Sequence, residues 1–146
     1  MNEAQLVAMR AIESKRKCLE RFRDLSLQCT KRLAMGDFAG LKEFLEERDA
    51  ILKAIDLYDR KLQEALKAVA DGAQQSELQA QTRPTHLAVV QLVEEIRGLD
   101  GVLLEKIEAE GKRVEEEVSK ANRAKEALGK FRSGLDDRGE EVDQKV

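Results

Sequence analysis

The first part of the chain carries apolar residues three or four positions apart, the spacing that places them on one face of a helix. Residues 3–34 contain neither Gly nor Pro, and only Lys15, Arg16 and Lys17 interrupt the pattern. The stripe consists of Met9, Ile12, Leu19, Phe22, Leu25, Cys29 and Leu33. This spacing predicts one long amphipathic helix over 3–34.

A second amphipathic helix is predicted over 38–70. Its apolar positions are Phe38, Leu41, Leu45, Leu52, Ile55, Leu62, Leu66 and Val69. Arg48 and Asp59 occupy two positions of this seam, where polar residues cost stability but can fix the register of packed helices. Gly36 suits the left-handed conformation that ends a helix, and Asp37 can cap the next one. Such a short connection predicts an antiparallel hairpin.

The third helical region is predicted over 86–132, after a loop over 71–85. The loop segment is rich in Gln, Ser and Thr and contains Pro84. Over 87–104 the apolar residues cover more than one helical face, and Gly98 and Gly101 predict a kink there.

Beyond Ile107 the apolar stripe of the third region becomes narrow. Its members are Val114, Val118, Ala121, Leu128 and Phe131. The remaining residues, 133–146, are acidic and poor in apolar side chains, so we expect them to form a mobile tail.

These patterns predict an all-α fold in which a hairpin of long antiparallel helices packs with a long third helix as a three-helix bundle or coiled coil. The chain has 146 residues, of which 3% are aromatic and one is Pro, which favours helices over a β-sandwich or barrel. A single helical domain is expected over 1–132. No run of about 18 apolar residues and no secretory signal is visible, so a cytoplasmic location is expected.

The charge distribution favours helix packing over nucleic-acid binding. Residues 1–35 carry eight Lys/Arg against four Asp/Glu, a net charge of +4, and residues 36–72 carry six against nine, a net charge of −3. The first two predicted helices are therefore complementary in charge, whereas the whole chain is acidic. We expect no nucleic-acid partner and no membrane insertion.

Few residues are suited to catalysis or metal binding. His86 is the only histidine, and Cys18 and Cys29 lie too far apart on one helix to form a disulfide. No zinc-ligand spacing, phosphate-binding loop or nucleophile motif is present. The sequence therefore predicts no enzymatic activity, no metal and no cofactor.

Two apolar features suggest contact with other proteins. The excess over 87–104 can be buried on two faces within the bundle, or it can mediate self-association. The self-association residues would be Leu92, Ile96, Leu99 and Leu103. The narrow stripe can either pack on the end of the bundle or lay its apolar face on a partner. The partner-binding residues would be Val114, Val118, Ala121, Leu128, Phe131 and Leu135.

The order of these features resembles the flagellar type III export chaperone family (FlgN/FliT type). The resemblance spans most of residues 5–132. It consists of a short Gly-Asp turn, a leucine-rich helix with an Arg before its second apolar cluster, a Leu-Asp step, and a basic, Ala-rich end with an aromatic residue. The matching stretches are 35–41 (MGDFAGL), 45–52 (LEERDAIL), 96–100 (IRGLD) and 122–131 (NRAKEALGKF).

The resemblance implies a small cytoplasmic helical chaperone. Such proteins bind the C-terminal helical segment of late flagellar axial proteins, at the hook–filament junction or filament cap, prevent premature polymerisation and deliver them to the export gate and its ATPase. The family's cargo contacts carry over to the narrow stripe, and its gate-docking aromatic carries over to Phe131. The family often has Tyr at that position, so Phe131 lacks a hydroxyl group. The alternative is a homodimeric coiled-coil scaffold or adaptor without flagellar cargo.

Overall fold

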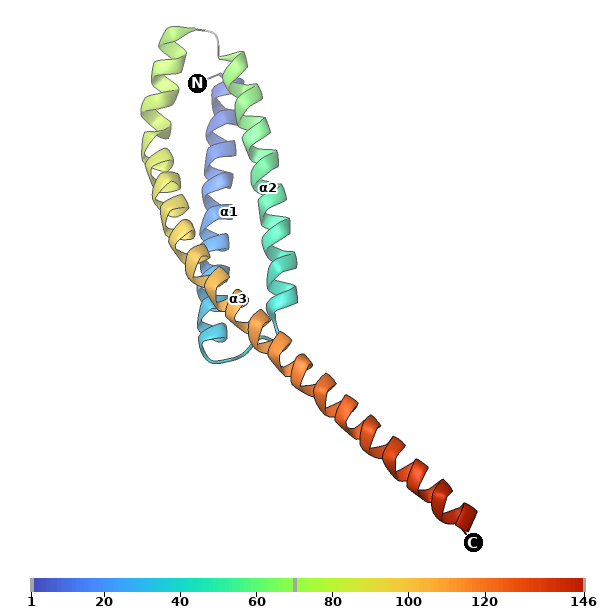
Figure 1. Cartoon of the computed structure of the whole chain (residues 1–146). Coiled ribbons are helices and arrows are strands. Elements are labelled where there is room, and N and C mark those ends of the chain that lie inside the picture. The colour runs from blue at the N-terminus through green and yellow to red at the C-terminus, as the bar shows by residue number, and fades with distance from the viewer. Residues whose placement is uncertain (1, 70, 146) are drawn as a thin grey trace. The chain divides into compact units, whose positions relative to one another are not determined.

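The computed structural model describes the backbone of residues 2–69 and 71–145 and the side chains of residues 2–69 and 71–134. Three helices follow in order: α1 (Glu3–Ala34), α2 (Leu41–Ala68) and α3 (Gly72–Lys145) (Figure 1). The described residues include no strand, which confirms the predicted all-α class. The chain divides into two units, Met1–Lys106 and Ile107–Val146, and the single domain expected over 1–132 stays a prediction.

Hydrogen bonds from side chains define the start of α1. The Asn2 side chain accepts a bond from the Gln5 backbone N–H at 2.9 Å, and the Gln5 side chain accepts one from the Asn2 backbone N–H at 2.8 Å. This reciprocal pair is a capping box, which satisfies two donors that the first helical turn leaves unpaired. The side-chain amide of Gln5 also donates a hydrogen bond to the backbone carbonyl of Gln74 at 3.0 Å. The cap of α1 is therefore joined to α3.

The link between α1 and α2 is a tight turn at Gly36, as predicted. Gly36 has a φ of 77°, in the left-handed region that glycine adopts without steric cost. Asp37 accepts a hydrogen bond from the Ala39 backbone N–H at 3.2 Å. It therefore stabilises the turn, and α2 begins at Leu41 instead of residue 38.

The loop predicted over 71–85 is wrong, because α3 already begins at Gly72. Asp71 acts as its cap: the carboxylate accepts from the Ala73 backbone N–H at 2.9 Å, and the Asp71 carbonyl accepts from the Gln75 N–H at 2.9 Å. The helix continues through Pro84. Pro84 and the residue four before it, Ala80, are both exposed, so water can replace the hydrogen bond that proline removes.

Tertiary packing explains why this polar segment is helical. Leu78 is only 3% exposed and packs in a cluster with Ala8, Ala65 and Val69. This cluster brings the start of α3 against both other helices. Burial of one leucine and a connected cap outweighs the loop-like composition of the segment.

The core of unit Met1–Lys106 lies between α1, α2 and the first part of α3 (Figure 1). In that unit α1 and α3 run in the same direction and α2 runs in the opposite direction. Many buried residues of each helix lie three, four or seven positions apart, as in coiled-coil packing. The main cluster consists of Ile12, Leu19, Phe22, Ile51, Val89, Leu92 and Ile96. Helix α3 continues through Gly98 and Gly101, and the kink expected there stays a prediction.

Two polar seam residues form ion pairs between helices. Arg48 of α2 binds Asp100 of α3 at 2.9 Å, and its guanidinium carbon lies 4.9 Å from the centre of the Phe22 ring on α1. Lys15 of α1 binds Asp59 of α2 at 2.8 Å. Arg48 therefore contacts both neighbouring helices at one level of the bundle. Both seam residues predicted from the sequence, Arg48 and Asp59, have their partners within the chain.

Two further predictions were that the chain does not insert into a membrane and that residues 133–146 form a mobile tail. Within the part that the structure describes, none of the helices has a stretch long and apolar enough to cross a bilayer. The mobile tail predicted over 133–146 lies almost entirely outside the residues whose side chains are described, although α3 is assigned through Lys145.

We expect Leu103→Ala to lower the free energy of unfolding of the bundle by about 2–4 kcal/mol, because the leucine is fully buried and its removal leaves a cavity. The neighbouring Leu104 is 53% exposed, so Leu104→Ala should change it by less than about 0.5 kcal/mol. Urea unfolding followed by the fluorescence of Tyr58, the only tyrosine, measures both. Equal effects of the two substitutions would contradict the packing described here.

A double-mutant cycle of Arg48→Met and Asp100→Asn should give a coupling energy of about 1 kcal/mol, because both side chains are about three-quarters buried. The matched control is the pair Arg60–Asp56 on α2, whose side chains are 73% and 65% exposed. Its coupling should stay below about 0.5 kcal/mol. The same urea titration serves both cycles, and an Arg48–Asp100 coupling no larger than the control would disprove its role between helices.

Candidate protein-binding surface

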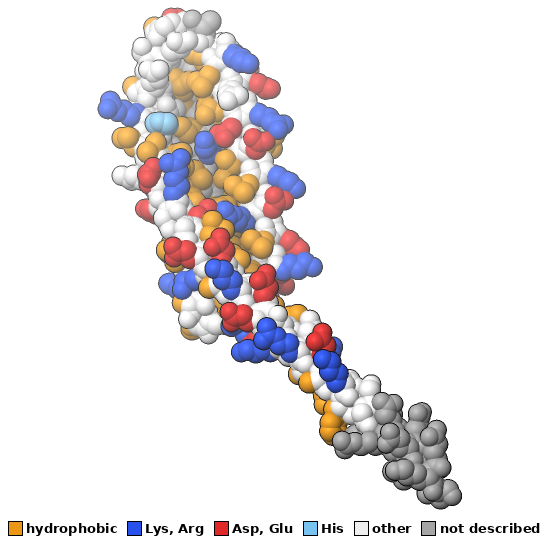
Figure 2. Space-filling view, viewed as in Figure 1, with side chains coloured by type: hydrophobic (Ala, Val, Ile, Leu, Met, Phe, Trp, Pro, Cys, Tyr) orange, Lys and Arg blue, Asp and Glu red, His pale blue; other side chains and the backbone are white. Residues whose placement is uncertain are grey.

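The narrow stripe of the sequence forms an exposed apolar surface in the unit Ile107–Val146. Every described side chain from Gly111 to Gly134 is exposed. The apolar members are exposed by 44% at Val114, 53% at Val118 and 55% at Leu128. A helical repeat of 3.6 residues places these three side chains within an arc of about 80° on one side of α3. Figure 2 shows hydrophobic side chains gathered along one edge of this segment.

The other predicted partner-binding residues have different positions relative to this stripe. Ala121 is exposed and lies within the same arc. Phe131 is 64% exposed and is rotated by roughly 60° from Leu128 around the helix axis. Leu135 lies outside the residues whose side chains the structure describes. The structure thus gives a one-sided row of apolar side chains that Lys125 interrupts, with an aromatic residue beside its end.

Local ion pairs support the helix beneath the stripe. Arg113 donates to Glu110 at 2.9 Å and also binds Glu117 one turn further along. The hydrogen bond from Arg113 lowers the pKa of the Glu110 carboxyl group from its ordinary value. Pairs three and four residues apart stabilise a helix without tertiary packing, although each effect is modest at an exposed site. The Glu110 carboxylate therefore remains charged at neutral pH and helps to hold Arg113 beside the stripe.

The stripe is poorly suited to pairing with a copy of itself. A two-stranded coiled coil needs apolar residues at both alternating seam positions. One position holds Ile107, Val114, Ala121 and Leu128, but the other holds Gly111, Val118, Lys125 and Arg132. Self-pairing would bring like charges together at Lys125 and Arg132 and leave a gap at Gly111. A partner with a different sequence that packs on the stripe avoids both the contact between like charges and the gap at Gly111.

The residues predicted for self-association lie mainly inside the bundle. Leu92, Ile96 and Leu103 are 5%, 8% and 0% exposed, and Leu99 is half-buried. Leu92 and Ile96 belong to the main cluster formed with α1 and α2. These four residues of the apolar excess over 87–104 are thus largely covered within this chain, whereas Leu87, Val90, Val102 and Leu104 are 53%, 45%, 44% and 53% exposed. Self-association through this region stays a prediction.

A second apolar surface is a groove of about 840 Å³ in the unit Met1–Lys106. It lies between α2 and the first turns of α3, with α1 beneath, and hydrophobic side chains are visible along it (Figure 2). Its floor includes Ala8, Ile12 and Leu78, and its α2 wall includes Leu62 and Leu66. The sequence did not predict this groove, because its other wall falls in the segment interpreted as a loop.

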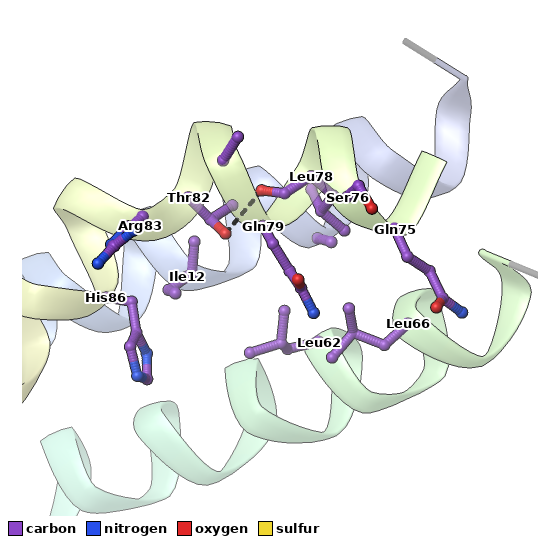
Figure 3. A pocket seen from close by; sticks show the side chains of 12 residues that line it. Ile12, Leu62, Leu66, Gln75, Ser76, Leu78, Gln79, Thr82, Arg83 and His86 are labelled. Carbon is purple, nitrogen blue, oxygen red and sulfur yellow. Dashed lines mark hydrogen bonds between the residues drawn. The ribbon is translucent and has the colours of Figure 1, made fainter. Parts of the chain in front are cut away.

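The α3 wall of the groove is polar and carries positive charge at one end. Gln75 and Gln79 lie towards the start of the helix, and Gln79 extends towards Leu62 and Leu66 (Figure 3). Arg83 and His86 lie one to two turns further along. Among the described residues, neither forms an ion pair within 4.0 Å. His86, which the sequence placed at a helix start, instead lines this groove.

The groups with reactive chemistry are dispersed. No three His, Cys, Asp or Glu residues of the described regions lie close enough together to hold a metal ion. Cys18 is half-buried and Cys29 is buried, and both are free thiols. Burial raises the pKa of the Cys29 thiol, which keeps it in the less reactive protonated form. The two apolar surfaces are therefore the features from which function can be argued.

Comparison with known proteins does not place the chain in a family, since no family profile, curated protein or solved structure matches it.

Replacing both Val118 and Leu128 with Ser should leave the unfolding midpoint of the bundle within error of the wild type, because both side chains are already exposed. The control is Leu92→Ser, which places a hydroxyl group in the core and should lower the midpoint strongly. Tyr58 fluorescence in urea reports on the bundle in both variants. A large shift for the Ser double variant would show that the stripe is packed in solution.

Proposed function

We propose that this protein is a cytoplasmic export chaperone for late flagellar axial proteins. It binds the helical C-terminal segment of a hook–filament junction or filament-cap protein, prevents premature polymerisation and delivers the cargo to the export gate and its ATPase. The single observation that carries the proposal is the one-sided apolar stripe of Val114, Val118 and Leu128 on a helix whose described side chains beyond Glu110 are all exposed. The flagellar part of the proposal follows from the family resemblance in the sequence.

The stripe suits transient binding of an amphipathic helix. A subunit that polymerises through helices exposes apolar faces before assembly, and a second helix can cover them in the meantime. Full burial of one Val or Leu side chain contributes about 1.5–3 kcal/mol. Three such residues contribute about 4.5–9 kcal/mol before the loss of rotational and translational freedom on association, so an affinity near the micromolar range needs further contacts around the stripe. Such a complex forms without chemistry and dissociates when the cargo is handed over.

Phe131 supports a separate contact with the export gate. Its ring is 64% exposed, more than Val114, Val118 or Leu128, and it lies beside the arc that these three residues share. Exposed aromatic residues are frequent anchors of protein interfaces. The ring of Phe131, about 60° around the helix axis from Leu128, can therefore contact the gate beside cargo that lies on the stripe.

The scaffold alternative has less support. The leucines and isoleucine that would form its dimer seam are largely buried in this chain. Arg48 and Asp59, which could have fixed the register of a dimer, are paired with Asp100 and Lys15 of the same chain. We therefore keep the chaperone as the proposed function.

Titration calorimetry with C-terminal helical fragments of the hook-associated and filament-cap proteins of the same genome tests the proposal. We expect a defined stoichiometry and a Kd well below about 100 μM for at least one fragment. The variant Val118→Glu/Leu128→Glu should weaken binding at least about tenfold, because charges replace the apolar contact.

The matched control is Leu57→Glu, which changes a leucine that is 50% exposed on α2. It should leave the affinity for the fragment unchanged. The proposal fails if none of the fragments binds below about 100 μM, or if the control weakens binding as much as the stripe variant does.

A further inference from the structure

The face of α2 that turns towards α3 carries a row of leucines that the chain covers only by half. Arg48 marks this face, because it binds Asp100 of α3 at 2.9 Å. Leu45 and Leu52 lie three residues before and four residues after Arg48, and Leu66 follows about five helical turns further along. These three leucines are 45%, 47% and 46% exposed. An apolar row therefore remains open along α2, on the side next to α3.

The groove of about 840 Å³ continues this leucine row at one end of the bundle. Leu66 belongs to both, since it lines the groove together with Leu62. The facing helix α3 is also apolar and open: Val90, four residues after His86, is 45% exposed, and Leu104, four residues after Asp100, is 53% exposed. Figure 2 shows hydrophobic side chains between α2 and α3 along the bundle. The leucine row and the groove thus form one seam within the unit Met1–Lys106.

The spacing of the seam matches one helix. Leu52 follows Leu45 by one heptad and Leu66 follows Leu52 by two, and Asp59, at the position between them, is paired with Lys15. The row from Leu45 to Leu66 is about 32 Å long, which corresponds to about three heptads of a partner helix. Helices bind in such grooves through apolar residues at the same repeat. A helix in this seam would lie against α2 and α3 and complete a bundle of four helices.

The lining of the groove selects the charge of the partner. It includes the cationic Arg83 and the His86 side chain, which extends towards α2 (Figure 3), and it includes no Asp or Glu. Among the described residues, neither Arg83 nor His86 forms an ion pair within 4.0 Å. A carboxylate of the partner would gain a charge-assisted hydrogen bond from the guanidinium group, whereas a lysine or arginine would be repelled. The groove therefore favours an acidic helix over a basic one.

We propose that the seam between α2 and α3 binds one acidic amphipathic helix of a partner protein. This helix has apolar residues at heptad spacing over about three heptads and a carboxylate opposite Arg83. Its apolar face covers Leu45, Leu52 and Leu66, which the chain leaves half exposed. The site shares no residue with the stripe of Val114, Val118 and Leu128, so this inference does not rest on the proposed export function.

A designed peptide and the full-length protein test the apolar part of the site. The peptide has about three heptads with leucine at the first and fourth positions, glutamate beside the apolar face in the first and last heptads, and a fluorescein label. Fluorescence anisotropy should give a Kd below about 100 μM, and Leu52→Ser/Leu66→Ser should raise it at least about tenfold. The matched control is Leu57→Ser, which should leave the Kd unchanged. Leu57 is 50% exposed but is rotated by about 140° from Leu52 on α2.

A second peptide, with glutamine in place of each glutamate, tests the charge. Arg83→Gln should weaken binding of the acidic peptide about fivefold and leave binding of the neutral peptide unchanged. Arg21→Gln, which changes an exposed arginine of α1 that does not line the groove, should affect neither peptide. The stripe variant Val118→Glu/Leu128→Glu should bind the acidic peptide as the wild type does, which separates this site from the proposed cargo site.

Four results would overturn the proposal. They are an acidic peptide that does not bind below about 100 μM, equal losses for Leu57→Ser and the double leucine variant, equal effects of Arg83→Gln on both peptides, and self-association that the double leucine variant abolishes. The last result, measured by sedimentation velocity, would assign the seam to a second copy of the chain. Tyr58 fluorescence in urea verifies that each variant is folded.

Discussion

The length of α3 is the constraint on which the rest of the structure depends. It has 74 residues, whereas α1 and α2 have 32 and 28. A helix satisfies its own backbone hydrogen bonds at any length, but its apolar face is stabilised only where other side chains cover it. Side chains of α1 and α2 cover the apolar face of α3 between Leu78 and Leu103, which are 3% and 0% exposed. Beyond Glu110, every described side chain of α3 is exposed. There, the ion pairs of Arg113 stabilise the helix instead.

Within the bundle, polar residues select one arrangement of the helices. Arg48 contacts Phe22 and Asp100, so a shift of either neighbouring helix by one turn would separate a charged pair that is largely shielded from water. Lys15 interrupts the apolar stripe of α1 because it reaches Asp59 on α2. These pairs satisfy inside one chain the seam charges that could otherwise have favoured a dimer.

The sequence predicted the features that depend on local spacing and missed those that depend on distant contacts. The bounds of α1 and the left-handed Gly36 follow from periodicity and turn chemistry, and the exposed stripe was identified by its spacing. The start of α3 was missed because its helix is held by Leu78 packing on α1 and α2, which composition does not reveal. The groove was missed for the same reason, since its polar wall lies in that segment.

The weakness of the stripe is consistent with its proposed use. An apolar seam at every heptad position would pair permanently with its own copy, whereas Gly111 and Lys125 prevent such a coiled coil. What remains is a surface that gains free energy only against a partner shaped and charged to fit it.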